Sequence, residues 1–162
     1  MTTLPNKRIL IISDLHCPFH HPDTLRFLQA VKEKYNPDRI ISIGDEIDSH
    51  AMSFHQSDPD CFSAGDELKR AREIIWKIEE IYPKMDVIDS NHGSLWYRKD
   101  KYHGIPRDAM RSYEEILGTK KWTWHYDLTL RLPNGQPCYF HHGKSANYLL
   151  ASQKLGMSYV QG

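Results

Sequence analysis

Two short motifs with metal-binding side chains each come directly after an apolar run. Asp14 and His16 follow the run 9–12, and Asp45 follows the run 40–43. Because residues two apart on an extended segment share a face, Asp14 and His16 are expected to chelate one ion together. Asp45 is expected to bridge that ion to a second one. Two ions about 3.5–4 Å apart clamp phosphoryl oxygens and acidify a bridging water, so these residues favour hydrolysis of a phosphate ester.

Two later motifs offer ligands for the second ion. Asn91 and His92 follow a third apolar run, and His141 and His142 precede Gly143. Asn91 provides an amide oxygen and His142 an imidazole to this ion. The mixture of carboxylate, amide and imidazole groups suits zinc, manganese or iron. Neighbours on a strand face opposite ways, so only one histidine of the pair is expected to bind.

His92 is expected to act in proton transfer rather than in metal binding. As the neighbour of Asn91 on an extended chain, its side chain should point away from the second ion. An imidazole that is near the metals but not bound to them can stabilise the phosphate or protonate the leaving oxygen. It needs an orienting carboxylate, and Asp48, three residues after Asp45, is the candidate. We therefore expect His92 and Asp48 to form the catalytic pair.

The elements that position these motifs follow a β-α-β-α-β pattern. The predicted elements are buried strands at 8–13, 39–43 and 85–88, a helix from Pro22 to Asn36, and a longer helix from its cap at Ser63 to Ile81. This pattern implies parallel strands joined by right-handed crossovers, and ligand sites in such sheets lie beyond the carboxyl ends of the strands. Asp14, Asp45 and Asn91 all fall at that edge.

The second half of the chain predicts a different set of elements. They are a helix from Pro106 to about Leu117, a hairpin of strands 122–132 and 138–141, a short helix 146–155 and a last strand 157–161. The segment 94–121 holds seven basic and four acidic residues together with several aromatic ones. This excess weakly favours a polyanionic substrate such as a nucleotide or nucleic acid. Other phosphodiesters and phosphoproteins stay open as substrates.

The overall composition indicates a cytoplasmic protein that does not bind membranes. Basic and acidic residues are equal in number, 21 of each, so no global charge recruits nucleic acid or an anionic membrane. The first apolar run is too short for a signal peptide, and no stretch approaches the roughly 20 apolar residues that span a bilayer. The three cysteines are far apart, which favours a reducing compartment over a disulfide framework.

The ordered set D-x-H, G-D-x-x-D, N-H and H-G resembles the calcineurin-like metallophosphoesterase superfamily. The resemblance covers Ile9 to Gly162; each motif alone is weak, but the ordered set is strong. It implies an α/β fold, a sandwich of two mixed β-sheets flanked by helices. It implies two divalent ions and direct attack on phosphorus by a metal-bound hydroxide. It also implies a catalytic pair, His92 and Asp48, and the metal ligands Asp14, His16, Asp45, Asn91 and His142.

The sequence departs from the family pattern at three points, and each departure affects what we expect of the site. The third motif is usually G-N-H followed by an acid, whereas here Ser90 and Gly93 flank it, which leaves the local hydrogen bonding open. The doubled histidine leaves the ligand open between His141 and His142, and the following glycine favours His142. The family closes its site with G-H-x-H, whereas the present sequence ends at Gly162.

The third departure leads us to expect a single domain over 1–162 that is incomplete at its C-terminus and lacks the last strands. An alternative function follows from this expectation. The chain would be an inactive or weakly metal-binding N-terminal fragment, and a complementing chain would supply the missing His-x-His. A catalytically dead interaction module is a weaker alternative, because such a module has no need of an intact Asp14, His16 and Asp45.

Overall fold

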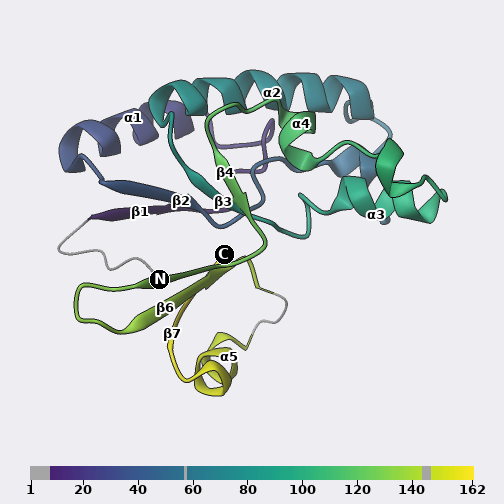
Figure 1. The fold of residues 1–162 in the computed structure, drawn as a ribbon. Helices are drawn as coiled ribbons and strands as arrows, with labels where there is room; N and C mark the ends of the chain where they lie inside the picture. The colour runs from purple at the N-terminus through teal and green to yellow at the C-terminus, as the bar shows by residue number, and fades with distance from the viewer. Residues whose placement is uncertain (1–7, 57, 144–146) are drawn as a thin grey trace.

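The chain forms two β-sheets that pack against each other, with helices on the outer sides (Figure 1). The computed structural model describes residues 8–56, 58–143 and 147–162. The first sheet has the order β1 (Ile9–Ile12), β2 (Arg39–Ser42), β3 (Asp86–Ile88), β4 (Thr123–His125). The second has the order β5 (Leu128–Arg131), β6 (Pro137–His141), β7 (Ser158–Gln161). The expected two-sheet α/β fold is confirmed; within the described residues the first sheet is purely parallel and the second is mixed.

The expected β-α-β-α-β unit forms the first half of the structure. α1 (Thr24–Tyr35) joins β1 to β2, and α2 (Ala64–Ile81) joins β2 to β3. α2 begins at its predicted cap, because the Ser63 hydroxyl accepts a hydrogen bond from the Asp66 N–H at 3.2 Å. α1 ends at Asn36, whose left-handed backbone closes the last turn. Local signals in the sequence therefore mark the start of α2 and the end of α1. α1 itself begins at Thr24, two residues after the predicted Pro22, and no side chain caps it.

Alternate residues of the first sheet contribute to two separate cores, one on each face. On one face, Val87 of β3 packs with Ile75 of α2. On the other face, Ile41 and Ile88 pack with Phe140 of the second sheet. In Figure 1, α1 and α2 lie over the first sheet and the second sheet lies beneath it. The first sheet is thus covered on both faces, which explains the nearly continuous apolar runs of its strands.

The helix predicted from 106 to 117 is broken into two pieces. A 3₁₀ turn covers Arg107–Ala109, the backbone then extends, and α4 covers Tyr113–Leu117. The break comes from Ser112, which has an extended backbone and forms a capping box with Glu115. A capping box satisfies the first N–H groups of a new helix, so α4 starts there and does not continue the turn after Pro106.

The single strand predicted over 122–132 is two strands that belong to different sheets. β4 pairs with β3 in parallel, whereas β5 pairs with β6 in an antiparallel hairpin. The chain passes from the first sheet to the second at Tyr126 and Asp127. Alternation of apolar and polar residues reports that one face is buried, but it does not report which strand is the partner. The expected hairpin therefore survives, with its first strand shorter than predicted.

Two further helices complete the described structure. α3 (Leu95–Tyr102) follows the third site motif and was not among the predicted helices, because only Leu95 is buried and its other residues give little amphipathic signal. α5 (Tyr148–Leu155) joins β6 to β7 and ends at Gly156, as predicted, while the expected first residue Ala146 lies outside the described residues. Of the helices described, none has both the length and the apolarity needed to cross a membrane.

The packing of α2 on the first sheet predicts where a substitution is most destabilising. Ile75 is completely buried, whereas Phe27 on α1 is 65% exposed. Ile75→Ala should lower the free energy of unfolding by about 2–5 kcal/mol, because it removes buried methyl groups and leaves a cavity. Phe27→Ala is the surface control and should change it by less than about 0.5 kcal/mol. Urea unfolding followed by circular dichroism measures both, and equal values for the two variants would contradict the packing described.

Candidate metal centre

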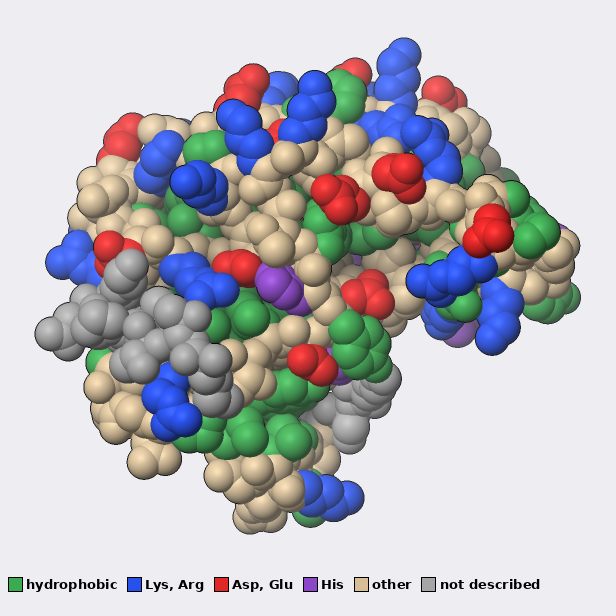
Figure 2. All heavy atoms as spheres, viewed as in Figure 1, with side chains coloured by type: hydrophobic (Ala, Val, Ile, Leu, Met, Phe, Trp, Pro, Cys, Tyr) green, Lys and Arg blue, Asp and Glu red, His purple; other side chains and the backbone are tan. Residues whose placement is uncertain are grey.

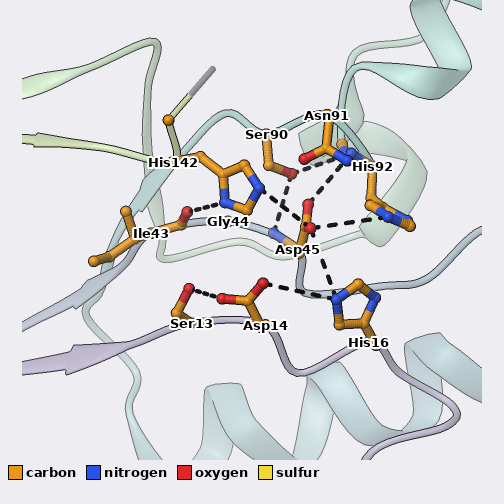
Figure 3. Close-up of polar contacts among 12 residues, drawn as sticks. Ser13, Asp14, His16, Ile43, Gly44, Asp45, Ser90, Asn91, His92 and His142 are labelled. Atoms are coloured by element: carbon orange, nitrogen blue, oxygen red, sulfur yellow. Dashed lines mark hydrogen bonds and ion pairs between the residues drawn. The ribbon is translucent and has the colours of Figure 1, made fainter. Parts of the chain in front are cut away.

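The side chains singled out in the sequence meet at the carboxyl ends of the strands (Figure 3). Because β1, β2 and β3 are parallel neighbours, the loops that follow them lie side by side. β6 belongs to the second sheet, so the site draws on both sheets. The loop after β1 provides Asp14 and His16, and the loop after β2 provides Asp45 and Asp48. The loop after β3 provides Asn91 and His92, and the loop after β6 provides His142.

The backbone around Asp14 and His16 is left-handed, and the extended backbone assumed from their spacing is wrong. The φ angles are +54° at Asp14, +48° at His16 and +56° at Asp45. This conformation is uncommon for residues other than glycine and needs support from its surroundings. The Asp14 N–H donates to the Gly44 carbonyl at 3.2 Å, and the His16 N–H donates to the Asp45 carbonyl at 2.9 Å. The side chains still converge, with His16 Nε2 3.8 Å from Asp14 Oδ1.

Three imidazoles face one oxygen of the Asp45 carboxylate. Asp45 is only 3% exposed, at the centre of the group of side chains in Figure 3. Its Oδ2 atom lies 3.2 Å from Nε2 of His142, 3.7 Å from Nε2 of His16 and 3.9 Å from Nε2 of His92. A carboxylate that accepts donors from several directions is the geometry required of a ligand that bridges two ions.

Each of these imidazoles is held by its other ring nitrogen. His142 Nδ1 donates to the Ile43 carbonyl at 2.8 Å, and His92 Nδ1 donates to the Asp48 carbonyl. His16 Nδ1 lies 2.8 Å from the Asp48 carboxylate. Because a carbonyl oxygen can only accept, the Nδ1 atoms of His92 and His142 carry a proton. A ring that carries its proton on Nδ1 can offer Nε2 to a metal ion, which is the arrangement typical of metal-ligating histidines.

Asp48 supports two histidines rather than one. Its carboxylate hydrogen bonds His16, whereas the same oxygen is 3.7 Å from His92 Nδ1. The support of His92 comes from the Asp48 backbone carbonyl. Asn91 and His92 lie in a turn and not on extended chain, and Nε2 of His92 faces Asp45. That the His92 side chain points away from the second ion stays a prediction. The ring centroids of His16 and His92 are 4.8 Å apart and edge to face.

The doubled histidine is separated by the pleat of β6. His142 is only 9% exposed and points at Asp45. His141 points the other way, where its ring stacks on Tyr139 with a centroid distance of 5.9 Å and accepts a hydrogen bond from the Gly143 N–H at 2.7 Å. The geometry therefore places His142, and not His141, beside the Asp45 carboxylate.

Ser90 supplies the local hydrogen bonding that the altered third motif left open. Its hydroxyl accepts hydrogen bonds from the N–H groups of Asp45 and Gly93, each at 3.0 Å. Ser90 also restricts the opposite loop, because a Cβ at Gly44 would overlap the Cβ of Ser90 and the φ angle of Gly44 is +98°. Asn91, next to Ser90, is exposed, and Figure 3 shows its side chain on the same side of Asp45 as His92.

The charges at the centre support one another. Burial disfavours the charged form of Asp45, but hydrogen bonds from His142 and Ser90 outweigh it and lower the pKa of the carboxyl group. The hydrogen bond to Asp45 raises the pKa of His142 to about 9, against the effect of burial. The buried carboxylate thus holds a positive partner on the imidazole, in the place where a metal ion would supply that charge.

Glu46 is a buried acid beneath the site that the sequence interpretation missed. It is only 1% exposed, and the Ser42 hydroxyl donates to its Oε1 at 2.5 Å. Burial raises the pKa of Glu46 to about 7, although the hydrogen bond from Ser42 opposes the shift. The signal in the sequence is an acid between Asp45 and Ile47, which are themselves buried. A charged residue at an interior position of a buried loop is uncommon enough to note.

The donor groups fit divalent metal ions. Within the described part of the chain, two groups of three side chains each place three donor atoms within 4.8 Å of one another. One group is Asp14, Asp45 and His142, and the other is His16, Asp48 and His92. Carboxylate and imidazole donors in this proportion suit zinc, manganese and iron. These sets differ from the pairing expected from the sequence, in which Asp14 shares an ion with His16; that pairing stays a prediction.

A comparison with protein families assigns the chain to one of them. Residues 7–149 match the family model described as calcineurin-like phosphoesterase. The chain belongs to the calcineurin-like phosphoesterase family. A comparison with curated proteins gave no significant match. Membership confirms the superfamily expected from the four motifs, and together with the Asp45 centre it supports metal-dependent hydrolysis of phosphoesters as the activity of the family fold.

The hydrogen bonds of Ser90 predict a specific loss when its hydroxyl is removed. Ser90→Ala should lower the free energy of unfolding by about 1–3 kcal/mol, because it leaves buried N–H groups of Asp45 and Gly93 without an acceptor. Ser94→Ala is the control, since the Ser94 hydroxyl bonds only an exposed carbonyl, that of Asn91. Thermal unfolding followed by circular dichroism compares the two variants, and an equal stability for both would contradict this role of Ser90.

The opposite orientations of the two histidines give a matched pair of variants. His142→Ala should weaken Mn²⁺ binding at least about tenfold, because it removes an imidazole that faces Asp45. His141→Ala removes a ring that stacks on Tyr139 and should leave Mn²⁺ affinity unchanged. Isothermal titration calorimetry with MnCl₂ measures both affinities. A larger loss for His141→Ala would reverse the assignment.

Proposed function

We propose that this chain hydrolyses phosphate esters, phosphodiesters or phosphomonoesters, with two divalent metal ions at the Asp45 centre. The observation that carries the proposal is the convergence of His16, His92 and His142 on one oxygen of a buried carboxylate. A purely structural carboxylate needs one or two hydrogen bonds, and it has no use for three imidazoles that are each fixed through Nδ1. The family of the chain points to the same chemistry.

In this proposal the residues of the loops after β1, β2, β3 and β6 would hold the metals. Asp14 and His16 would hold one ion, His142 and Asn91 would hold the second, and Asp45 would bridge the two. Bound ions offset charge on the phosphoryl oxygens and lower the pKa of a water molecule that attacks phosphorus. The ions we propose are manganese, zinc or iron, because the donors are carboxylates and imidazoles.

His92 is proposed to handle the leaving group. Its Nδ1 proton is committed to the Asp48 carbonyl, so Nε2 is the nitrogen that faces the centre. The protonated ring would donate its Nε2 proton to the leaving oxygen as the ester bond breaks. Asp48 keeps the ring in this orientation and holds His16 as well, so it acts as a positioning residue. No thiol takes part, because burial raises the pKa of the nearby Cys17 to about 12.

A cytoplasmic location is part of the proposal and rests on the cysteines. Cys17, Cys61 and Cys138 are free thiols, and two of them are buried. Unpaired cysteines suit a reducing compartment.

The position of Gly162 favours a second candidate. β7 leads Gly162 to the site, where an added Cβ would lie 2.5 Å from Ser13 Oγ and 3.0 Å from His142 Nδ1. A segment with the family's His-x-His pattern that joins this point would reach the metals. In this candidate, residues 1–162 by themselves bind metal weakly and turn over slowly, and a complementing chain with that segment restores the rate.

Substitution of the bridging carboxylate tests the proposed function. Asp45→Asn should lower kcat/KM for bis(p-nitrophenyl) phosphate in the presence of Mn²⁺ at least about 100-fold, because an amide cannot bridge two cations as a carboxylate does. Asp60→Asn, in an exposed loop, is the control and should retain the rate of the unmodified chain. A full rate for Asp45→Asn would overturn the site assignment.

An extended version distinguishes the two candidates. The chain with Gly-His-x-His in place of its last residue should bind Mn²⁺ more tightly and turn over faster than residues 1–162 if the second candidate is correct. Equal, strong turnover by both versions would exclude the second candidate. The absence of turnover in both, with Mn²⁺ bound, would count against hydrolysis.

A further inference from the structure

A pocket extends from the metal centre along α3. It has a volume of about 310 Å³ and is lined in part by Asp48, Asn91 and His92 of the site and by Phe54 and Arg98 beyond it. This volume lies at the lower end of the range of about 300–1,000 Å³ found for small-molecule pockets. A group that leaves the phosphorus on the His92 side would enter this pocket, so its lining bears on which esters fit.

Phe54, which lines this pocket, lies beside two cations. Phe54 is 51% exposed although Lys99 Nζ lies only 4.2 Å from the centre of its ring. Arg98 Cζ is 5.7 Å from the same centre, and the Tyr102 ring packs on Phe54 edge to face. An exposed large aromatic side chain that packing does not require is a candidate surface for a flat ligand.

Arg98 links the Phe54 side of the pocket to the turn that holds Asn91 and His92. Its Nη2 donates to the carbonyl of Asn91 at 3.1 Å, so the guanidinium is held beside the proposed metal ligand. Within the described part of the chain, neither Arg98 nor Lys99 has an ion pair with a carboxylate. Their charge is therefore available to an anion that lies in the pocket. Figure 2 shows Lys and Arg side chains next to hydrophobic ones over the part of the surface that α3 forms.

A second groove on the other side of the turn repeats this combination. Its lining includes Gly93, next to His92, and reaches Tyr97, Arg107 and Tyr126. Arg107 Cζ lies 5.5 Å from the centre of the Tyr97 ring. Aromatic rings and cations thus stand on both sides of the turn that carries His92. A ligand in which phosphates join a series of flat groups could therefore contact an aromatic ring and a cation on each side of its central phosphate.

We propose that the natural substrate is a single-stranded oligonucleotide, with the base of the leaving nucleotide in the Phe54 pocket and the next phosphate of the strand on Arg98 and Lys99. Stacking on aromatic side chains together with backbone-tracking cations is the usual way in which proteins hold single strands. The proposal rests on the proposed function for the cleavage step and adds the substrate class. A phosphopeptide has the phosphate but lacks a series of flat bases, so the two rings of Phe54 and Tyr97 would have no partner.

Binding of an oligonucleotide that resists hydrolysis tests the substrate class apart from turnover. The probe is fluorescein-labelled octathymidylate with phosphorothioate linkages, and its anisotropy is followed with the Mn²⁺-loaded chain. Phe54→Ala should weaken binding about tenfold, in the range expected for loss of one stacked base. Phe54→Trp should retain the affinity, and Phe54→Leu, which keeps apolar bulk without a ring, should behave like Phe54→Ala. Phe27→Ala, on the exposed surface of α1, is the control and should leave binding unchanged.

The salt dependence of binding tests the cations. Arg98→Ala should reduce the slope of log K against log salt concentration by about 0.7, the value for one phosphate contact on a single strand. Lys154→Ala, far along the chain on α5, is the charge-matched control and should leave the slope as it is. Equal affinity for a phosphopeptide of the same charge, or no effect of Phe54→Ala, would overturn the proposal.

Hydrolysis of bis(p-nitrophenyl) phosphate, measured in parallel, separates the two proposals. Turnover of this diester without tight oligonucleotide binding would reject the substrate class and retain the proposed function. Phe54-dependent oligonucleotide binding without any turnover would reject the proposed function and retain the pocket as a site for single strands.

Discussion

The buried Asp45 carboxylate is the feature on which the rest of this site depends. A carboxylate taken out of water needs positive partners, or its burial costs several kcal/mol. Here His142 supplies a positive partner, because its hydrogen bond to Asp45 raises its pKa to about 9. The imidazoles of His16 and His92 are turned toward the same oxygen. Charge at the centre therefore determines how the surrounding loops lie, and it creates the place that divalent ions would occupy.

The loops reach this arrangement through an unfavourable backbone conformation. Asp14, His16 and Asp45 are all left-handed, a state that side chains other than glycine disfavour. Hydrogen bonds between neighbouring loops hold this state, and Ser90 adds two more from the opposite turn. Part of this support comes from Gly44 and Ser90, neither of which is a proposed metal ligand. Changes at Ser90 or Gly44 therefore reach the centre through the backbone rather than through lost ligands.

The contact between the two sheets is as important to the site as the loops. His142 comes from the second sheet, and its Nδ1 is bonded to the Ile43 carbonyl at the end of β2. Ile43 also packs in the core between the sheets, with Phe140 two residues before His142. The same apolar contact that closes the sandwich thus sets the distance between His142 and Asp45. The second sheet must therefore pack against the first for the site to be complete.

Apolar runs and helix caps were enough to predict the β-α-β-α-β unit, because it depends on local periodicity and residue types. The order of four motifs indicated the family, and the two-sheet fold followed from that resemblance. Local patterns failed at Ser112, where a new cap interrupts a helix, and at 122–132, where one alternating segment serves two sheets. They also missed the left-handed turns, the buried Glu46 and the double role of Asp48. The choice of His142 over His141 had only weak support from a glycine; tertiary structure decided it through the pleat of β6. Each of these features depends on hydrogen bonds or packing between residues far apart in the chain, and spacing along the sequence carries no record of such partners.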